Sequence, residues 1–164
     1  MSGAIILKGI RYVDESEGYN FEGAVDDICK KPNGDLIVVM FKSTSKNVFD
    51  WEDTYSKWEY AKGYRRQLEM YQWLLEKNGF SVASEGYLVY YNGKKNEPMF
   101  DQKLEFDLHL VKLECDNSWV AQAVIAAKTT LEGAMPKAAS SCENCNYLRK
   151  RWEVSQKDPT NLID

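Results

Sequence analysis

The chain has 164 residues, of which 44% are hydrophobic and 13% aromatic, which indicates one globular domain with a sizeable core and excludes a disordered chain. Its net charge of −4 excludes a global basic field, so binding of nucleic acid would need a local basic patch. No apolar run approaches the length of a membrane span and the N-terminus shows no signal-peptide pattern, so we expect a cytoplasmic protein without a membrane partner.

Three strands are predicted at the start of the chain, at residues 4–13, 21–30 and 36–42, from their apolar runs. Residues 31–35 read Lys-Pro-Asn-Gly-Asp, and such a segment between two apolar runs is typical of the turn of a β-hairpin. We therefore expect the second and third strands to pair, and all three to form an antiparallel start to the sheet.

The expected hairpin places two charged residues side by side. Asp26 lies in an apolar setting, and Lys42 directly follows a hydrophobic run. A charge at the end of an apolar strand is costly unless it is paired or functional. A carboxylate that can hold a divalent metal, beside an ammonium that can orient a water or steady a phosphate, suits phosphodiester hydrolysis. A buried Asp–Lys pair that serves only structure is the alternative.

A long helix is predicted over residues 54–78, with Gly79 as its C-cap. Gly63 interrupts the helical pattern. Gln67 and Tyr71 are one turn apart and therefore share a face of this helix. Gln67 stands among apolar neighbours, so its amide needs hydrogen-bond partners.

Two further strands, at residues 81–91 and 104–114, and a second helix at residues 119–131 are predicted next. His109, the only histidine, is expected on the surface face of its strand, opposite the two leucines beside it. A single histidine excludes a His-rich metal site and weakens any Ser-His-Asp or Cys-His scheme. The order β-β-β-α-β-β-α predicts an α/β fold with a mixed sheet and helices on both faces.

Three motifs carry a resemblance to a known family: Gly-Ala-Val-Asp at residues 23–26, Val-Val-Met-Phe-Lys-Ser-Thr-Ser-Lys at residues 38–46, and Gln-Leu-Glu-Met-Tyr at residues 67–71. Together they resemble the PD-(D/E)XK nuclease superfamily, and most closely its RecB-type branch, shared with CRISPR-associated adaptation exonucleases. The later Asp-Asn-Ser-Trp-Val, a helix and a closing Cys-x-x-Cys also fit that order, so the resemblance covers residues 21–151.

The resemblance implies a restriction-endonuclease-like α/β core, in which helices flank a mixed central β-sheet on both faces. We expect one such domain over residues 1–154 and a polar C-terminal tail at residues 155–164. It also implies a divalent-metal-dependent enzyme, a deoxyribonuclease that hydrolyses phosphodiester bonds in DNA with Mg²⁺ or Mn²⁺.

Roles for individual residues follow from the same resemblance. Asp26 would be the metal-binding aspartate, and the backbone carbonyl of Phe41 would complete the metal coordination. Lys42 would be the catalytic lysine that places the attacking water or stabilises charge on the phosphate. Gln67 and Tyr71 would form the Gln-x-x-x-Tyr motif beside the site.

Contacts to the substrate are expected from three basic residues. The resemblance implies that Lys46 touches the backbone of the nucleic acid. Arg65 and Arg66 belong to a basic stretch of the long helix, where the neighbouring aromatic residues Trp58, Tyr60 and Tyr64 could stack on unpaired bases. The alternative for this stretch is a solvated helix face whose charges are balanced by Glu59, Glu69 and Glu76.

Met40 departs from the family pattern, which has Asp or Glu two residues before the lysine. A thioether is a poor ligand for Mg²⁺ or Mn²⁺, so the substitution should weaken metal binding and impair activity. Glu22, Asp27 and Asp35 do not obviously replace the missing carboxylate. The alternative function is therefore a catalytically inactive nuclease-fold domain that binds DNA or a protein partner.

The four cysteines are too sparse for a disulfide scaffold. The pair Cys142 and Cys145 alone is incomplete for zinc or for an iron–sulfur cluster, so we expect no cluster and a reduced pair. A zinc-binding module rests on these cysteines only and is the weakest hypothesis for this chain.

Overall fold

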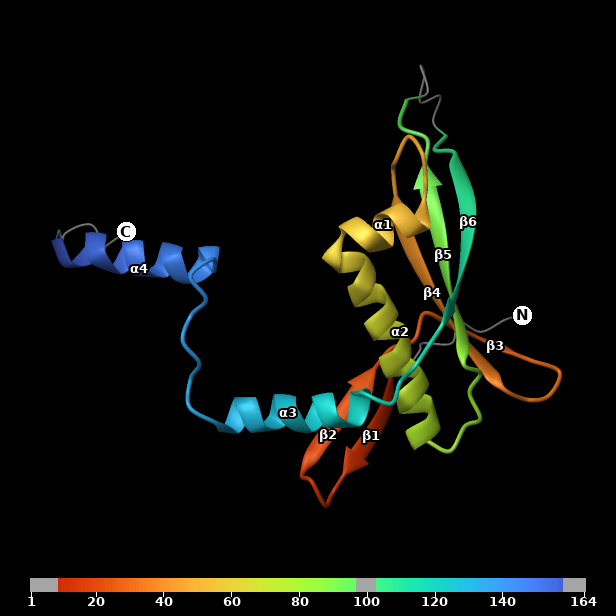
Figure 1. The fold of residues 1–164 in the computed structure, drawn as a ribbon, viewed down its shortest axis with the longest axis horizontal. Coiled ribbons are helices and arrows are strands. Elements are labelled where there is room, and N and C mark those ends of the chain that lie inside the picture. The colour runs from red at the N-terminus through yellow and green to blue at the C-terminus, as the bar shows by residue number, and fades with distance from the viewer. Residues whose placement is uncertain (1–8, 97–102, 158–164) are drawn as a thin grey trace. The chain divides into compact units, whose positions relative to one another are not determined.

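The predicted hairpin is confirmed in a computed structural model that describes residues 9–96 and 103–157 (Figure 1). Strands β3 (Asp27–Lys30) and β4 (Leu36–Thr44) pair antiparallel, with Asp27 opposite Val39. The Gly34 N–H closes the turn on the carbonyl of Lys31 at 2.9 Å, and Gly34 has a φ of 98°. Glycine adopts this conformation without the penalty that a Cβ would bring.

The prediction of one antiparallel three-stranded start is wrong. Residues 21–30 belong to two strands, because β2 (Tyr19–Gly23) ends before β3 begins and pairs with β1 (Ile10–Asp14) in a separate two-stranded sheet. The break falls at residues 24–26 and includes Asp26, the predicted metal-binding aspartate. Residues 4–8 of the predicted first strand lie outside the described residues.

The main sheet has the order β3-β4-β5-β6, where β5 is Glu85–Gly93 and β6 is Phe106–Glu114. Strands β4 and β5 are parallel, whereas the other two pairs are antiparallel. A parallel pair needs a long crossover, which helices α1 (Trp51–Lys57) and α2 (Glu59–Lys77) supply. The predicted α/β class, with a mixed sheet flanked by helices, is confirmed.

The long helix predicted over residues 54–78 is two helices. Trp58 has φ −121° and ψ 121°, which is extended backbone, and it separates α1 from α2. The side chain of Asp50 caps α1 by accepting the N–H of Asp53. Gly63 lies inside α2 without interrupting it, and Gly79 follows its end with a φ of 84°, as expected of a residue beyond a helix C-terminus.

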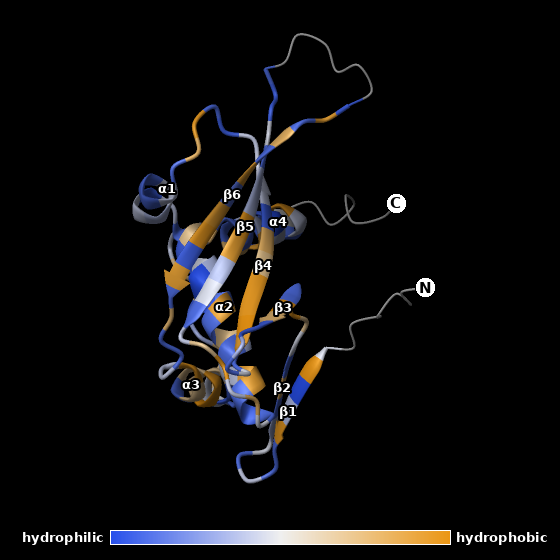
Figure 2. Cartoon of the chain, turned by 90° about the vertical axis from the view of Figure 1, so that its right-hand side faces the viewer, coloured by the Kyte–Doolittle hydropathy of each residue, from blue (hydrophilic) through white to orange (hydrophobic). Residues whose placement is uncertain are grey.

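Helix α2 packs its apolar side on one face of the main sheet. Leu68 and Leu75 of α2 are buried in one cluster with Val38, Met40 and Leu88 of β4 and β5. Strand β4 is hydrophobic along most of its length (Figure 2). Burial of this cluster stabilises the packing of α2 on the sheet, since each fully buried aliphatic side chain contributes about 1.5–3 kcal/mol to the free energy of unfolding.

The opposite face of the sheet also carries large apolar side chains. Phe41, Tyr91, Leu108 and Leu110 lie on that face and are between 41% and 66% exposed. The expected surface position of His109 is therefore wrong, because the alternation of β6 runs the other way: the histidine is half-buried, and its ring stacks on another aromatic ring with centroids 4.3 Å apart.

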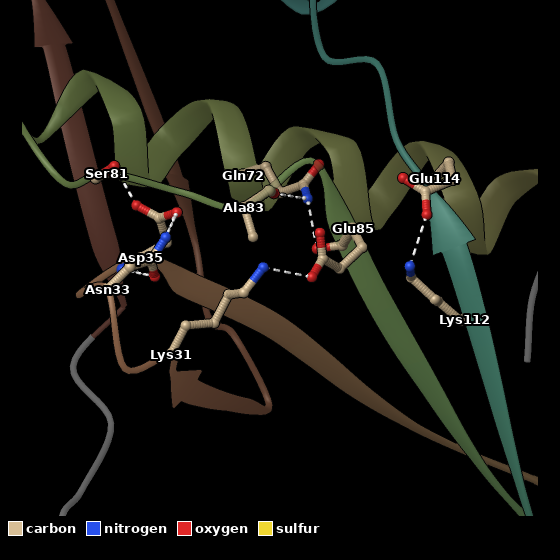
Figure 3. Close-up of polar contacts among 9 residues, drawn as sticks. All are labelled: Lys31, Asn33, Asp35, Gln72, Ser81, Ala83, Glu85, Lys112 and Glu114. Atoms are coloured by element: carbon tan, nitrogen blue, oxygen red, sulfur yellow. Dashed lines mark hydrogen bonds and ion pairs between the residues drawn. The ribbon is translucent and has the colours of Figure 1, made fainter.

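Polar contacts fasten both the hairpin turn and α2 to the segment that leads into β5 and to its first residue (Figure 3). Lys31 forms a 2.7 Å ion pair with Glu85. The Gln72 side chain donates to the carbonyl of Ala83 at 2.9 Å. The Ser81 hydroxyl donates to Asp35 at 2.6 Å, and this bond holds the pKa of the Asp35 carboxyl below its usual value. The Asp35 carboxylate thus stabilises the turn and its contact with Ser81.

The chain divides into two compact units, Met1–Lys128 and Thr129–Asp164. Helix α3 (Val120–Glu132) begins in the first unit, where Val120 is buried against α2. Helix α4 (Glu143–Lys157) lies in the second unit. The domain boundaries expected at residues 154 and 155 stay a prediction; residues 155–157 continue α4, and the rest of the expected tail lies outside the described residues. Within the described ranges, no helix combines the length and apolar character that a membrane span requires.

Candidate active site

Lys42 is half-buried near the end of β4, on the face that α2 covers. Its Nζ donates to Oε1 of Gln67 at 3.3 Å and lies 4.5 Å from the ring centroid of Tyr64, both on α2. Burial lowers the pKa of Lys42 from its ordinary value of 10.5, and the charge of Asp26 opposes this shift. An ammonium in this setting is less well solvated than a surface lysine, so it costs stability.

Asp26 directly precedes β3 and lies beside the edge of β4, past the last residue that β3 pairs with. Its Oδ2 accepts the backbone N–H of Phe41 at 2.9 Å, so a side chain satisfies the donor that a longer β3 would have paired. The N–H and C=O of one strand residue point to the same edge of the strand. The carbonyl of Phe41 therefore points to the edge where Asp26 lies, and the structure brings both residues close to Lys42.

Gln67 and Tyr71 continue the chain of contacts from Lys42. Nε2 of Gln67 donates to the hydroxyl of Tyr71 at 2.9 Å, while its Oε1 accepts from the lysine. The Gln67 amide therefore has a hydrogen-bond partner at its oxygen and another at its nitrogen. A Cβ added to Gly23 would lie 2.7 Å from Cε1 of Tyr71. Gly23 therefore leaves room for the tyrosine ring, which explains why a glycine precedes Asp26 in this motif.

Replacing Gly23 with alanine should displace the Tyr71 ring and loosen the contact of Gln67 with Lys42. We expect a loss of about 1–3 kcal/mol in the free energy of unfolding, because overpacking forces neighbouring groups to move, together with a lower rate of any cleavage reaction. The control is Gly63→Ala, whose new methyl meets no atom within 4 Å and which should stabilise the helix by about 0.5–1 kcal/mol. Urea unfolding measures the free energy of unfolding of both variants. Equal stability of the two variants would contradict the packing argument.

Met40 is completely buried and is opposite Leu88 in the sheet register. The side chain at the position where we expected a second carboxylate thus serves as core. Among the described residues, no group of three or more His, Cys, Asp or Glu side chains is arranged to hold a metal ion.

The three acidic residues considered above as replacements for the missing carboxylate are engaged in other contacts. Glu22 is 2.9 Å from Arg11 in an ion pair on the small sheet. Asp27 accepts the N–H of the residue after it at 2.8 Å. Asp35 is held by the hairpin turn. Asp26 is therefore the carboxylate that the structure places beside Lys42.

The three residues expected to contact substrate have partners within the protein. Arg65 donates to Glu69 at 3.0 Å and to the carbonyl of Glu114 at 2.8 Å, and Arg66 donates to Glu59 at 3.3 Å. These pairs match the alternative of a helix face balanced by glutamates. Lys46 donates through Nζ to Thr54 at 2.7 Å and lines a pocket that it shares with Tyr64, the aromatic partner of Lys42. Their contact with nucleic acid stays a prediction.

Sequence reasoning missed Tyr90 and Phe49, which line the same pocket. Tyr90 is the register partner of Lys42 on β5, and its ring lies 4.9 Å from that of Phe49. Local periodicity carries no signal for this neighbourhood, because it depends on the parallel pairing of β4 with β5.

A family model of the PD-(D/E)XK nuclease superfamily matches residues 4–149. The chain belongs to the PD-(D/E)XK nuclease superfamily. Its function is accordingly of the nuclease type, and nucleic acid is the substrate class of such proteins. No curated protein and no solved structure matches the chain. Membership of the RecB-type branch and the effect of Met40 stay predictions.

The cysteines of this PD-(D/E)XK protein lie in different settings. The N–H of Cys145 donates to Sγ of Cys142 at 3.4 Å, and hydrogen bonds from Cys145 lower the pKa of the Cys142 thiol. Burial raises the pKa of Cys115 to about 11, and Cys29 is exposed. The expectation of a reduced pair without a cluster stays a prediction.

Proposed function

We propose that this chain is a divalent-metal-dependent nuclease of the RecB type that hydrolyses phosphodiester bonds in DNA, with activity impaired by Met40. The observation that carries the proposal is the placement of Lys42, held half-buried by Gln67 and Tyr64 and close to Asp26. A desolvated lysine beside one carboxylate is a costly arrangement that a purely structural site has little need to keep.

The donor atoms fit a weak site for Mg²⁺ or Mn²⁺, the ions that PD-(D/E)XK nucleases generally use. Asp26 offers a carboxylate and Phe41 a backbone carbonyl, both of them hard oxygen ligands. Mg²⁺ keeps several waters and is commonly held by one or two carboxylates together with substrate phosphates. When bound, the ion would stabilise negative charge on the phosphate.

The remaining steps belong to the residues of the chain itself. Lys42 would orient the attacking water or offset charge that develops on the phosphate. Gln67 and Tyr71 hold the ammonium in place through their linked hydrogen bonds, so we assign them a positioning role. Lys46, Arg65 and Arg66 would lie along the nucleic-acid backbone, where Lys46 is the one next to the pocket.

Met40 favours a second candidate function, a catalytically inactive nuclease-fold domain that binds DNA or a protein partner. This side chain is fully buried, and no described carboxylate stands in for the missing ligand. Under this alternative, Lys42 would be retained for binding a phosphate group without cleaving it.

The two candidates differ in metal binding and cleavage. We would titrate the protein with Mn²⁺ by calorimetry and incubate it with labelled single- and double-stranded DNA. Asp26→Asn should abolish both metal binding and cleavage, whereas Asp27→Asn should retain them, because Asp27 accepts a backbone N–H next to it and faces away from the site. Wild-type protein that neither binds Mn²⁺ nor cuts supports the inactive domain. Equal loss in both variants contradicts the assignment of Asp26.

A further inference from the structure

A pocket of about 200 Å³ lies at the end of β4, lined by the two residues that follow Lys42 and by Tyr64, whose ring the Lys42 ammonium contacts. Aromatic rings of Phe49, Tyr60, Tyr64 and Tyr90 line it, together with the side chain of Lys46. Pockets for drug-sized ligands measure about 300–1,000 Å³. The volume here therefore suits one flat ring system and is too small for a base pair.

Tyr90 supplies an independent sign that this pocket takes a ligand. Its side chain is only 3% exposed, and its hydroxyl has no hydrogen-bond partner within the part of the chain that the structure describes. Buried polar groups are normally paired, so an unpaired hydroxyl on a pocket wall calls for a partner from outside the protein. Burial also raises the pKa of Tyr90, so the hydroxyl keeps its proton and can donate it in a hydrogen bond.

A row of aromatic side chains connects this pocket with the surface. The ring of Tyr64 lies under the Lys42 ammonium and 5.7 Å from the ring of Tyr60. Tyr60 stacks on Trp58 with centroids 6.0 Å apart, and these two side chains are 44% and 52% exposed. Successive bases of a single strand stack on such aromatic surfaces, because every base has a π face.

The wall of the pocket is preformed. The backbone N–H of Lys46 donates to Oδ1 of Asn92 at 2.7 Å, and Nδ2 of Asn92 donates back to the carbonyl of Lys46 at 2.9 Å. The Lys46 ammonium is fixed on Thr54. A rigid pocket loses less conformational entropy when it binds, which favours a small ligand.

We propose that this pocket binds one unpaired nucleobase, so that the nucleic acid lies on the protein as a single strand with a phosphate facing Lys42. The stacking surface is aromatic, and the polar partner of the base is the Tyr90 hydroxyl. The position of the phosphate rests on the proposed nuclease function, whereas the binding of the base does not. A duplex keeps its bases paired and stacked, so it cannot fill the pocket without unpairing.

Fluorescence anisotropy in buffer with a chelator tests base binding apart from cleavage. The probes are a labelled single-stranded oligonucleotide, the matching blunt duplex, and a series of single strands with one abasic position each. We expect the single strand to bind at least about tenfold more tightly than the duplex, and one abasic position to weaken binding by a similar factor, as the loss of one stacked base predicts.

Tyr90→Phe removes only the hydroxyl. It should raise the melting temperature of the free protein, because an unpaired buried group is lost, and weaken binding of the single strand several-fold. The control is Tyr91→Phe, since Tyr91 lies on the other face of β5 and is 41% exposed, so neither quantity should change.

Three results would overturn the proposal: equal affinity for duplex and single strand, a flat abasic series, or Tyr90→Phe that raises the melting temperature without weakening binding. Failure of the wild-type protein to bind the single strand at all would overturn it as well. If base binding holds but Mn²⁺ supports no cleavage, the pocket stands and the nuclease function fails. If the protein cleaves DNA while the abasic series is flat, the nuclease function stands and the proposal of base binding fails.

Discussion

Replacing Lys42 with methionine should abolish cleavage and raise the stability of the free protein at neutral pH. Methionine keeps most of the apolar stem and removes the half-buried charge, whose burial is the main cause of the lowered pKa of Lys42. The hydrogen bond to Gln67 is long at 3.3 Å and offsets little of that cost. Loss of a group that stabilises the transition state lowers the rate by about 100-fold or more.

The gain in stability should depend on pH in a defined direction. Because the pKa of Lys42 is lower in the folded protein than in the unfolded chain, the unfolded chain binds more protons between the lowered pKa and 10.5. Wild-type stability therefore rises relative to Lys42→Met as pH increases through that window. The advantage of the variant should be full at neutral pH and should shrink toward pH 10.5.

Thermal melts of both proteins from neutral to alkaline pH measure this difference. Lys46→Met is the matched control, because the Lys46 ammonium has a 2.7 Å hydrogen bond to Thr54 whose loss should lower stability by about 1 kcal/mol. If Lys42→Met also loses stability at neutral pH, the contacts of Lys42 with α2 stabilise the fold. The argument from the desolvation of Lys42 then fails.

The residues that gather at the site were predictable because each prediction used local chemistry. The Pro-Asn-Gly-Asp turn fixed the pairing of β3 with β4, and helical periodicity placed Gln67 and Tyr71 on one face. The hairpin also predicted that Asp26 and Lys42 lie near each other, the family resemblance supplied their roles, and the structure brings all four residues close together.

Long-range contacts decided the features that were not predictable. At the break between β2 and β3, the Asp26 side chain accepts a backbone hydrogen bond of β4, a contact that no apolar pattern encodes. His109 was placed on the wrong side because both faces of β6 are apolar, so alternation alone does not show which face α2 covers. Tyr90 joins the site only through the register of β4 with β5.

Replacing Met40 with aspartate should destabilise the free protein and make it a stronger metal binder and a faster nuclease. The side chain is fully buried beside Leu88, so a carboxylate there loses both packing and solvation, at a cost of about 2–5 kcal/mol. The same carboxylate lies two residues before Lys42, where the resemblance described above implies a second acidic ligand. Two carboxylates hold Mn²⁺ better than one.

Melting curves with and without Mn²⁺ separate these two effects. A ligand present at about 100 times its Kd adds about 2.7 kcal/mol to the stability of the folded state. Mn²⁺ should therefore recover much of the stability lost in Met40→Asp, and labelled DNA should be cut at least about tenfold faster if the second carboxylate contributes as little as about 1.4 kcal/mol to the transition state.

Val38→Asp is the matched control, because Val38 lies on the same face of β4, is also fully buried, and is one pleat further from Lys42. It should lose comparable stability and gain nothing from Mn²⁺. Rescue confined to Met40→Asp would mean that the chain has exchanged a metal ligand for core packing, a trade of activity for stability. Absence of rescue in both variants would show that position 40 does not face the metal and that the assigned site is wrong.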